Sequence, residues 1–507
     1  MMTLKVVRDP VIALLSGVLL AVSFPLLDWS FLAWIALVPL LLVLSRRPFV
    51  TGYAAGVGFF ATALYWLNIV MVTYGRMPLA LSILAYLLLV FYLALFFAIP
   101  LWLTERFRHR LSLPILLSLP VLWIVFEFLR GVLLTGFPWA LIGYSQHSNL
   151  TLIQSADLFG VYGIGFLIVL FNCLLTSLLR ALWRADSDLV PWRSLVFFVV
   201  LFAANWGYGT VRLGQEPARV DSPLTVGLIQ GNIDQAVKWD TDYQGTTMDT
   251  YLSLSEKALH GGAQFLIWPE SATPFYLQDP SPLSQKVQQF SEKTGSYLLT
   301  GSPAYEFRPE GVRYLNSAFL LAPDGSFMGR SDKVHLVPFG EYVPLSRFLP
   351  FVNKLVVGIG DFSPGVIKPL RVNGGSLGVL VCYEGIFPDL AREYVKAGSG
   401  LLVNVTNDAW FGRSSAPYQH LAMTRFRAIE NRRWLVRAAN TGISAIIAPS
   451  GEIVSASPLF QSAFVVGDIF FRTEMTLYTL WGGFLPLPFL LLSLFWLVRS
   501  RKKLLPS

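Results

Sequence analysis

Long apolar stretches dominate the first 215 residues of the chain and return near its end. A stretch of about 17–25 apolar residues is long enough to cross a bilayer as a helix. Seven such stretches precede the middle of the chain and one follows it, near residues 10–27, 29–45, 50–72, 78–103, 114–135, 159–182, 192–210 and 476–498. The pattern predicts a polytopic helical membrane part of eight spans, formed by a seven-span domain, 1–215, and a C-terminal transmembrane helix, 476–498.

The first of these stretches has the charge pattern of a signal peptide, because Lys5 and Arg8 precede it. No convincing small-residue cleavage site follows, and a second apolar stretch begins at once. We therefore expect the first stretch to be retained as a span.

Residues 222–470 have a different pattern. Short runs rich in β-branched residues alternate with polar helical patterns. The strand candidates include LTVGLIQGNI, AQFLIWPES, SYLLTGSP, SLGVLVCYEG and GLLVNVTNDAW, and Asp324-Gly325 predicts a hairpin turn. Alternating strands and helices predict an α/β layered domain with a buried, mixed sheet.

The composition agrees with a membrane protein, since 54% of the residues are hydrophobic and only 14% are charged. The net charge of +8 comes mostly from short loops beside the apolar stretches. If the spans alternate, one side holds Lys5, Arg8, Arg46, Arg47, Arg106, Arg108, Arg110, Arg180, Arg184, Arg193, Arg499, Arg501, Lys502 and Lys503. The positive side is cytoplasmic, so we expect both termini there, residues 211–475 on the other side, and no nucleic-acid partner.

Two ionisable residues lie inside a predicted span. Glu127 and Arg130 are three residues apart in VLWIVFEFLRG, so they share one helix face and can neutralise each other. Ionisable groups within a span are costly and are often functional. A structural ion couple is the plainer interpretation, and the sequence leaves both open.

The two cysteines, Cys173 and Cys382, are not placed to pair, because Cys173 lies in an apolar stretch and Cys382 in the 222–470 domain. A lone thiol in an oxidising compartment is a liability unless it has a function. Glu270 ends FLIWPE, Lys333 lies in GRSDKVHLVPFGEYVP, and Cys382 ends GVLVCYE. A carboxylate can take the proton of a thiol, and an ammonium can stabilise a thiolate and an oxyanion.

Each of these three residues alone has a plainer explanation. A carboxylate at a strand end can be a surface group, a loop lysine can be solvated, and a cysteine can be a small buried hydrophobe. The sequence contains no P-loop, no dinucleotide-binding glycine pattern and no His/Cys cluster with zinc spacing. We therefore expect no metal and no cofactor.

Four longer motifs surround the three residues: IWPES, KVHLVPFGEYVP, CYEGIFPD and NVTNDAWFG. Together they resemble the carbon–nitrogen hydrolase (nitrilase) superfamily, whose Glu–Lys–Cys triad lies on an αββα sandwich. The whole plan, with seven spans before this domain and one after it, resembles the apolipoprotein N-acyltransferase family over essentially the full length. The resemblance implies an αββα sandwich for 222–470.

The resemblance also implies an activity. Members of the family transfer an acyl chain from a phospholipid, typically phosphatidylethanolamine, to the α-amino group of the N-terminal S-diacylglyceryl-cysteine of an apolipoprotein. We hypothesise a ping-pong reaction through a Cys382 thioester. The loop charges predict a periplasmic catalytic domain on the bacterial inner membrane, and the resemblance favours a monomer.

Carried over residue by residue, the resemblance makes Glu270 the general base, Lys333 the oxyanion stabiliser and Cys382 the nucleophile. Glu341, in PFGEYVP, matches a second glutamate that helps to orient the lysine and the base. The remaining matches are to positions needed for efficient turnover or for the second substrate: Trp239, Tyr383 and Glu384.

Two alternatives to an acyltransferase remain open, because each would have a domain of the same fold. The first is a membrane-tethered amidase or nitrilase that hydrolyses a soluble substrate, and the second is a transporter or assembly scaffold with an inactive domain. The loop KLVVGIGDFSP contains Gly358 and Gly360, which predict either a movable lid or a packed loop.

Overall fold

The computed structural model describes residues 2–44, 47–183, 191–215, 223–309, 311–342 and 362–502. Most of the predicted lid loop, including Gly358 and Gly360, lies outside these ranges, as do Arg46, Arg184 and Lys503. The chain divides into two compact units. We call them the helical unit (Met1–Asn68, Leu79–Gln215 and Trp481–Ser507) and the sandwich unit (Ile69–Pro78 and Glu216–Leu480).

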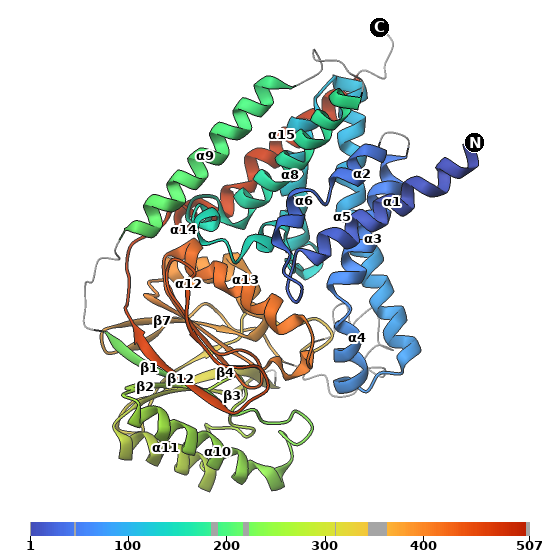
Figure 1. The fold of residues 1–507 in the computed structure, drawn as a ribbon. Helices are drawn as coiled ribbons and strands as arrows, with labels where there is room; N and C mark the ends of the chain where they lie inside the picture. The colour runs from blue at the N-terminus through green and yellow to red at the C-terminus, as the bar shows by residue number, and fades with distance from the viewer. Residues whose placement is uncertain are drawn as a thin grey trace. The chain divides into compact units, whose positions relative to one another are not determined.

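The helical unit consists of apolar helices joined by short turns (Figure 1). Its α-helices are α1 (Met2–Val22), α2 (Val38–Val43), α3 (Pro48–Ala63), α5 (Leu79–Leu111), α6 (Ile115–Val132), α7 (Leu150–Ile153), α8 (Ala156–Trp183), α9 (Trp192–Gly214) and α15 (Pro486–Lys502). Its 3-10 helices are η1 (Ser30–Trp34), η3 (Leu133–Thr135), η4 (Ile142–Gln146) and η9 (Gly482–Phe484).

Five helices in the described part of the chain are long and apolar enough to cross a membrane. They are Leu79–Leu111, Ile115–Thr135, Ala156–Trp183, Trp192–Gly214 and Leu477–Arg501. A bent pair, Pro48–Ala63 and Leu67–Tyr74, makes a sixth span if it counts as one, with a bend of 56°. The predicted eight spans are therefore not confirmed. The stretch predicted as span 29–45 forms only the shorter apolar helix Ser30–Val43, and α1 carries charged residues in its first half.

Glu127 and Arg130 both lie buried on α6. Glu127 Oε1 accepts a hydrogen bond of 2.7 Å from the backbone N–H of Ile142. Arg130 Nη1 donates to the carbonyl oxygens of Phe137, at 3.1 Å, and Trp139, at 2.7 Å. The two side chains thus hold the irregular segment that follows α6, which satisfies backbone groups that have no helical partner. This contact explains their presence on an otherwise apolar helix.

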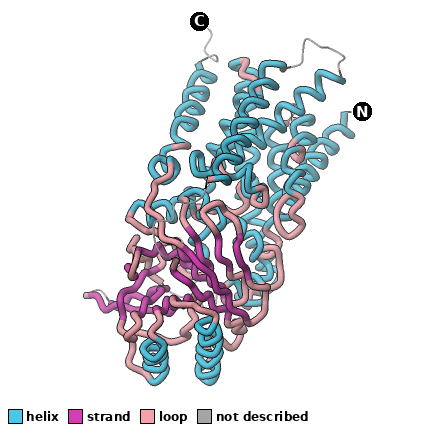
Figure 2. Tube along the Cα trace, turned by 60° about the vertical axis from the view of Figure 1, so that its left-hand side comes forward, coloured by secondary structure: helices cyan, strands magenta, loops and turns pink. Residues whose placement is uncertain are grey.

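The sandwich unit contains two six-stranded sheets within the described residues, drawn in magenta in Figure 2. The first sheet has the order β12-β1-β2-β3-β4-β5 and the second has the order β11-β10-β9-β8-β7-β6. The strands of the first sheet are β1 (Leu224–Gln230), β2 (Phe265–Ile267), β3 (Tyr297–Arg308), β4 (Gly311–Leu321), β5 (Phe327–Asp332) and β12 (Ala463–Ile469). Those of the second are β6 (Leu370–Val372), β7 (Gly375–Val381), β8 (Leu401–Thr406), β9 (Trp434–Ala439), β10 (Ala445–Ile447) and β11 (Ile453–Ala456).

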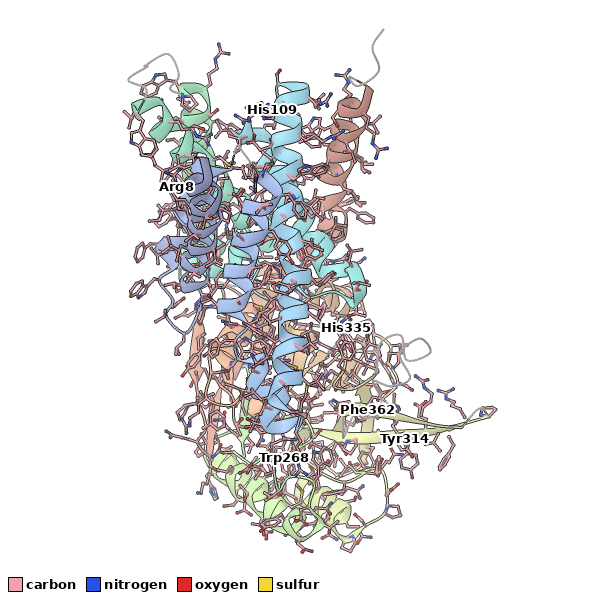
Figure 3. All side chains as sticks on the ribbon, turned by 90° about the vertical axis from the view of Figure 1, so that its right-hand side faces the viewer. Arg8, His109, Trp268, Tyr314, His335 and Phe362 are labelled. Carbon is pink, nitrogen blue, oxygen red and sulfur yellow. The ribbon has the colours of Figure 1, made fainter. Side chains whose placement is uncertain are left out.

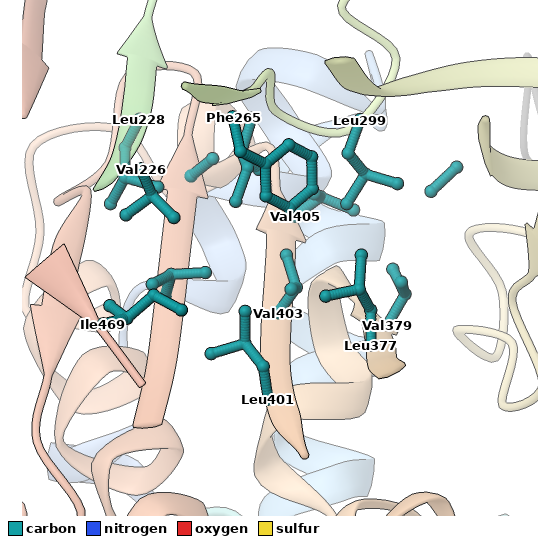
Figure 4. Close-up of a cluster of buried hydrophobic side chains, with 14 of the residues drawn as sticks. Val226, Leu228, Phe265, Leu299, Leu377, Val379, Leu401, Val403, Val405 and Ile469 are labelled. Carbon is teal, nitrogen blue, oxygen red and sulfur yellow. The ribbon is translucent and has the colours of Figure 1, made fainter. Parts of the chain in front are cut away.

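Helices cover the outer face of each sheet (Figure 1). The helices α10 (Thr241–His260) and α11 (Pro282–Thr294) pack on the first sheet, and α12 (Pro388–Lys396) and α13 (Ala416–Asn431) pack on the second. Between the sheets, side chains such as Val226, Leu299 and Val403 form a core (Figure 4). Central strands such as β2 and β8 are thereby buried on both faces, which explains why their sequences are mostly apolar. The αββα arrangement expected from the resemblance is confirmed.

Local sequence signals explain where several elements begin and end. The helix α11 starts after Ser281, whose hydroxyl accepts from the backbone N–H of Ser284, and it ends at Gly295 with a left-handed φ of 62°. The hairpin between β4 and β5 turns at Asp324-Gly325 as predicted, with Gly325 at φ 77°. The strand β12 was not predicted, although all seven of its residues pair with β1.

Each sheet has a block of parallel strands, β1-β2-β3 in the first and β7-β8-β9 in the second. Ligands commonly bind at the carboxyl ends of parallel strands, because loops from neighbouring strands meet there. In Figure 3, the long β3–β4 hairpin carries Tyr314, which forms a bridge to Phe362. This bridge brings the chain after residue 361 back beside the first sheet.

Candidate active site

Glu270 lies just beyond the carboxyl end of β2, and its side chain is buried. Its Oε1 accepts a hydrogen bond of 2.8 Å from Asn316 Nδ2, and its Oε2 accepts one of 3.0 Å from the backbone N–H of Asn407. Lys333 Nζ is 3.6 Å from the same Oε1. Asn407 follows β8, so Glu270 connects the first sheet to the second. A carboxylate held at both oxygens is fixed in direction, as a general base must be.

Lys333 follows β5, and only 1% of it is exposed. Its Nζ donates a hydrogen bond of 2.8 Å to Glu341 Oε1. Burial alone would lower the pKa of Lys333, but the carboxylates of Glu341 and Glu270 more than offset it and raise that pKa. The lysine is therefore a permanent ammonium, as an oxyanion partner requires.

Glu341 is fixed by three hydrogen bonds of 2.8 Å. Its Oε1 accepts from Lys333 and from Asn316 Nδ2, and its Oε2 accepts from the backbone N–H of Val337. Because Asn316 donates to both Glu270 and Glu341, its amide separates two carboxylates that would otherwise repel each other. Glu341 thus contacts the lysine directly and reaches the base through Asn316.

Cys382 lies at the carboxyl end of β7, where the strand turns into the 3-10 helix η7 (Cys382–Ile386). Its φ of +55° is left-handed, a conformation that costs a non-glycine residue about 1–3 kcal/mol. Burial and the Glu270 carboxylate raise the pKa of the Cys382 thiol to about 12, while the Lys333 ammonium acts in the opposite direction. The resting cysteine is consequently a neutral thiol that needs a base before it can act as a nucleophile.

Glu384 is fully buried and accepts three backbone N–H hydrogen bonds. Val334 and His335 donate to Oε1 at 2.6 and 2.8 Å, and Val381 donates to Oε2 at 2.6 Å. Its carboxylate therefore ties the segment after Lys333 to the turn that carries Cys382. Burial raises the pKa of Glu384 to about 7, although these N–H groups favour the charged form.

The last two predicted site residues, Trp239 and Tyr383, are more exposed than Glu270 and Lys333. Trp239 is 50% exposed and precedes α10. Tyr383 lies next to Cys382, with its ring 5.0 Å from that of Phe387 and 6.1 Å from that of His335. The exposed indole of Trp239 and the half-buried phenol of Tyr383, which is next to Cys382 in the sequence, are both suited to contact a substrate.

Sequence reasoning missed Lys238, the neighbour of Trp239. Lys238 is 1% exposed, and its Nζ donates a hydrogen bond of 3.1 Å to the backbone oxygen of Glu270. Burial lowers the pKa of Lys238 to about 8, against the opposing effect of Glu270 and Cys382. Asn316 was also missed. The sequence held a weak signal for both residues. Lys238 lies between Val237 and Trp239, and Asn316 lies within the apolar run YLNSAFLL.

A segment from the N-terminal half of the chain belongs to the sandwich unit. The π-helix η2 (Val70–Tyr74) places Tyr74 edge-on to Trp410, with ring centroids 5.8 Å apart. Trp410 belongs to the NDAWFG motif that follows β8. The stretch predicted as a single span, 50–72, is bent by 56°, and the segment after the bend contacts the NDAWFG motif through Tyr74.

The arrangement offers a buried carboxylate, a buried ammonium and a strained thiol at one edge of the sandwich. This set can activate a thiol, stabilise a tetrahedral oxyanion and hold an acyl group as a thioester. Among the described residues, no three His, Cys, Asp or Glu side chains are grouped so as to hold a metal ion.

Two family models match the chain. The apolipoprotein N-acyltransferase N-terminal domain matches residues 16–174, and the carbon–nitrogen hydrolase domain matches residues 225–473. Proteins named apolipoprotein N-acyltransferase are similar over nearly the full length. The one from Geobacter metallireducens is 49% identical over 94% of this chain and 92% of its own, and the one from Methylococcus capsulatus is 35% identical over 93% and 92%.

Two solved structures match about half of this chain. A nitrilase-superfamily protein of Saccharomyces cerevisiae is 17% identical, with a TM-score of 0.40 over 53% of this chain and 97% of its own. An amidase from Nesterenkonia sp. is 20% identical, with a TM-score of 0.37 over 51% and 95%.

Proposed function

The chain belongs to the apolipoprotein N-acyltransferase family, and we propose that it transfers an acyl chain from a phospholipid to the α-amino group of the N-terminal S-diacylglyceryl-cysteine of apolipoproteins. The observation that carries the proposal is the cluster of two buried side chains, Glu270 and Lys333, with the partly buried Cys382. The same chain has at least five membrane-length apolar helices among its described residues.

The first half-reaction forms a thioester. Glu270 takes the proton of the Cys382 thiol as its sulfur attacks the carbonyl carbon of an acyl ester. The Lys333 ammonium and a backbone N–H near Tyr383 stabilise the oxyanion. When the C–O bond breaks, the lysophospholipid oxygen takes the proton from Glu270 and leaves.

The second half-reaction forms an amide. The α-amine of the acceptor attacks the thioester carbonyl, and Glu270 takes a proton from its nitrogen. The C–S bond breaks, the thiolate recovers a proton, and the N-acyl product leaves. An amide is more stable than a thioester, so this step is favourable and the enzyme returns to its starting state. Trp239 and Tyr383 contact the substrates, whereas Glu341 and Glu384 orient the groups that react.

The membrane location suits both proposed substrates. Extracting a diacyl lipid into water costs about 0.8 kcal/mol for each exposed methylene. We propose that the membrane spans, eight by the sequence prediction, hold the sandwich at the periplasmic surface of the inner membrane. There the monomeric enzyme reaches phosphatidylethanolamine and the lipid-anchored acceptor without that cost.

The test uses the full-length protein in detergent, phosphatidylethanolamine with a labelled acyl chain, and a diacylated lipopeptide with a free N-terminal amine. We expect the label on the lipopeptide as an amide. The matched control is the same lipopeptide with its amine acetylated, which should stay unlabelled. Release of labelled fatty acid with no labelled lipopeptide would show transfer of the acyl group to water and would contradict the proposed N-acylation.

A further inference from the structure

The backbone of Cys382 is held by two side chains that the proposed mechanism does not use. Its carbonyl oxygen accepts one hydrogen bond of 3.2 Å from Asn404 Nδ2 and another of 3.2 Å from His420 Nε2. Asn404 Nδ2 also donates to the carbonyl oxygen of Leu380 at 2.9 Å. The carbonyls on either side of the left-handed turn are therefore both fixed, and the fixation comes from β8 and α13.

His420 is completely buried in a cluster of charged groups. Its Nδ1 lies 3.1 Å from Asp408 Oδ1 and 3.1 Å from Arg437 Nη2, and that same Nη2 donates to Asp408 Oδ2 at 2.6 Å. Arg437 Nη1 donates to Asn404 Oδ1. The network thus links the two side chains that hold the Cys382 carbonyl.

The network determines the protonation of His420. Arg437 and Asp408 balance each other, so a second cation in this dry cluster would be uncompensated. Burial and the Arg437 guanidinium lower the pKa of His420, which agrees with a neutral ring. A carbonyl oxygen only accepts, so the ring carries an N–H at Nε2, and its Nδ1 faces both Asp408 Oδ1 and Arg437 Nη2.

We propose that His420 is a positioning residue for the nucleophile, holding the strained turn of Cys382 through its Nε2–H so that the thiol faces Glu270 and Lys333. The effect of His420 on acyl transfer rests on the proposed function. Its effect on the position of the thiol does not, since the hydrogen bond to Cys382 exists without a substrate. A misplacement of about 1 Å at a reacting group can lower a rate about 100-fold.

Two substitutions of His420 distinguish the contribution of Nε2 from that of Nδ1. A glutamine side chain places an N–H near the position of Nε2, whereas an asparagine side chain reaches only the position of Nδ1. In the full-length protein, we expect His420→Gln to keep acyl-enzyme formation within about threefold of wild type and His420→Asn to lower kcat about 10- to 100-fold with little change in KM. Met423→Ala is the matched control, because Met423 is buried on the same helix.

A second readout does not need the phospholipid. In a Cys173→Ala background, the rate at which iodoacetamide alkylates Cys382 should fall in His420→Asn and be kept in His420→Gln. If wild type forms no acyl-enzyme but this pattern holds, the proposed function fails and the positioning role stands. Equal rates in wild type and His420→Asn, or an equal loss in Met423→Ala, would overturn the positioning role.

Discussion

The acidity of the Cys382 thiol depends on two opposing charges. Besides burial, the carboxylate of Glu270 raises the thiol pKa and the ammonium of Lys333 lowers it. Glu270 is thus both the base that the reaction needs and a charge that disfavours the thiolate before proton transfer. This dual role makes the two charges separable by experiment.

We expect Glu270→Gln to lower the pKa of the Cys382 thiol below about 12, because one nearby negative charge is lost. Lys333→Met should raise that pKa, because the compensating positive charge is lost. The measurement is the rate of Cys382 alkylation by iodoacetamide as a function of pH, in a Cys173→Ala background.

Unlike the thiol pKa, acyl transfer should change in the same direction in Glu270→Gln and Lys333→Met. Both substitutions should abolish acyl-enzyme formation, since one removes the base and the other removes the oxyanion partner. A parallel shift of the thiol pKa in the two variants would contradict the opposing roles given to these charges.

At the scale of secondary structure, the site depends on how closely Glu270 approaches β3. A Cβ added to Gly301 would lie 2.5 Å from the Pro269 carbonyl oxygen and 2.5 Å from the Ser271 nitrogen. These are backbone atoms, so they cannot rotate away as a side chain would. Only glycine lets the turn that carries Glu270 lie directly on the strand.

We therefore expect Gly301→Ala to destabilise the protein by about 1–3 kcal/mol and to lower acyl-enzyme formation by more than the loss of folded protein explains. Gly245→Ala in α10 is the matched control, since a Cβ at that position meets no atom within 4 Å. Thermal unfolding and acyl-enzyme formation measure the two effects. Full activity in well-folded Gly301→Ala would show that the turn does not need this contact.

The elements that bear the triad could be predicted because their signals are local. The runs FLIWPE and GVLVCYE each combine an apolar strand with a polar residue at its end, and the structure places Glu270 and Cys382 at those ends. The partners of these residues could not be predicted in this way. Asn316 meets Glu270 across 46 residues of sequence, and Arg437 meets Asp408 across 29. No local periodicity encodes such contacts.

The prediction of membrane spans was limited in the same way, because it used only local sequence patterns. Hydrophobicity identified the apolar stretches, but it does not reveal where a helix bends. The chain bends by 56° between α3 and the segment Leu67–Tyr74, and Tyr74 belongs to the sandwich unit, where it contacts Trp410. Hydropathy alone predicted one span at 50–72 and could not indicate this bend.

At the scale of the whole molecule, the distribution of basic residues predicts which side of the membrane each part faces. We expect Ser326→Cys, in the exposed β4–β5 turn, to react with a membrane-impermeant maleimide in spheroplasts, in a background of Cys173→Ala and Cys382→Ala. His109→Cys, at the end of α5, should react only after the membrane is permeabilised. The reverse pattern would place the sandwich in the cytoplasm.

The central claim is that Cys382 carries the acyl chain between donor and acceptor. The most direct test is intact-protein mass spectrometry of the full-length protein after incubation with phosphatidylethanolamine, comparing wild type with Cys382→Ala. We expect wild type alone to gain the mass of one acyl chain, and hydroxylamine to remove it, as it removes a thioester. The same adduct on Cys382→Ala, or labelled lipopeptide product made by that variant, would contradict the account.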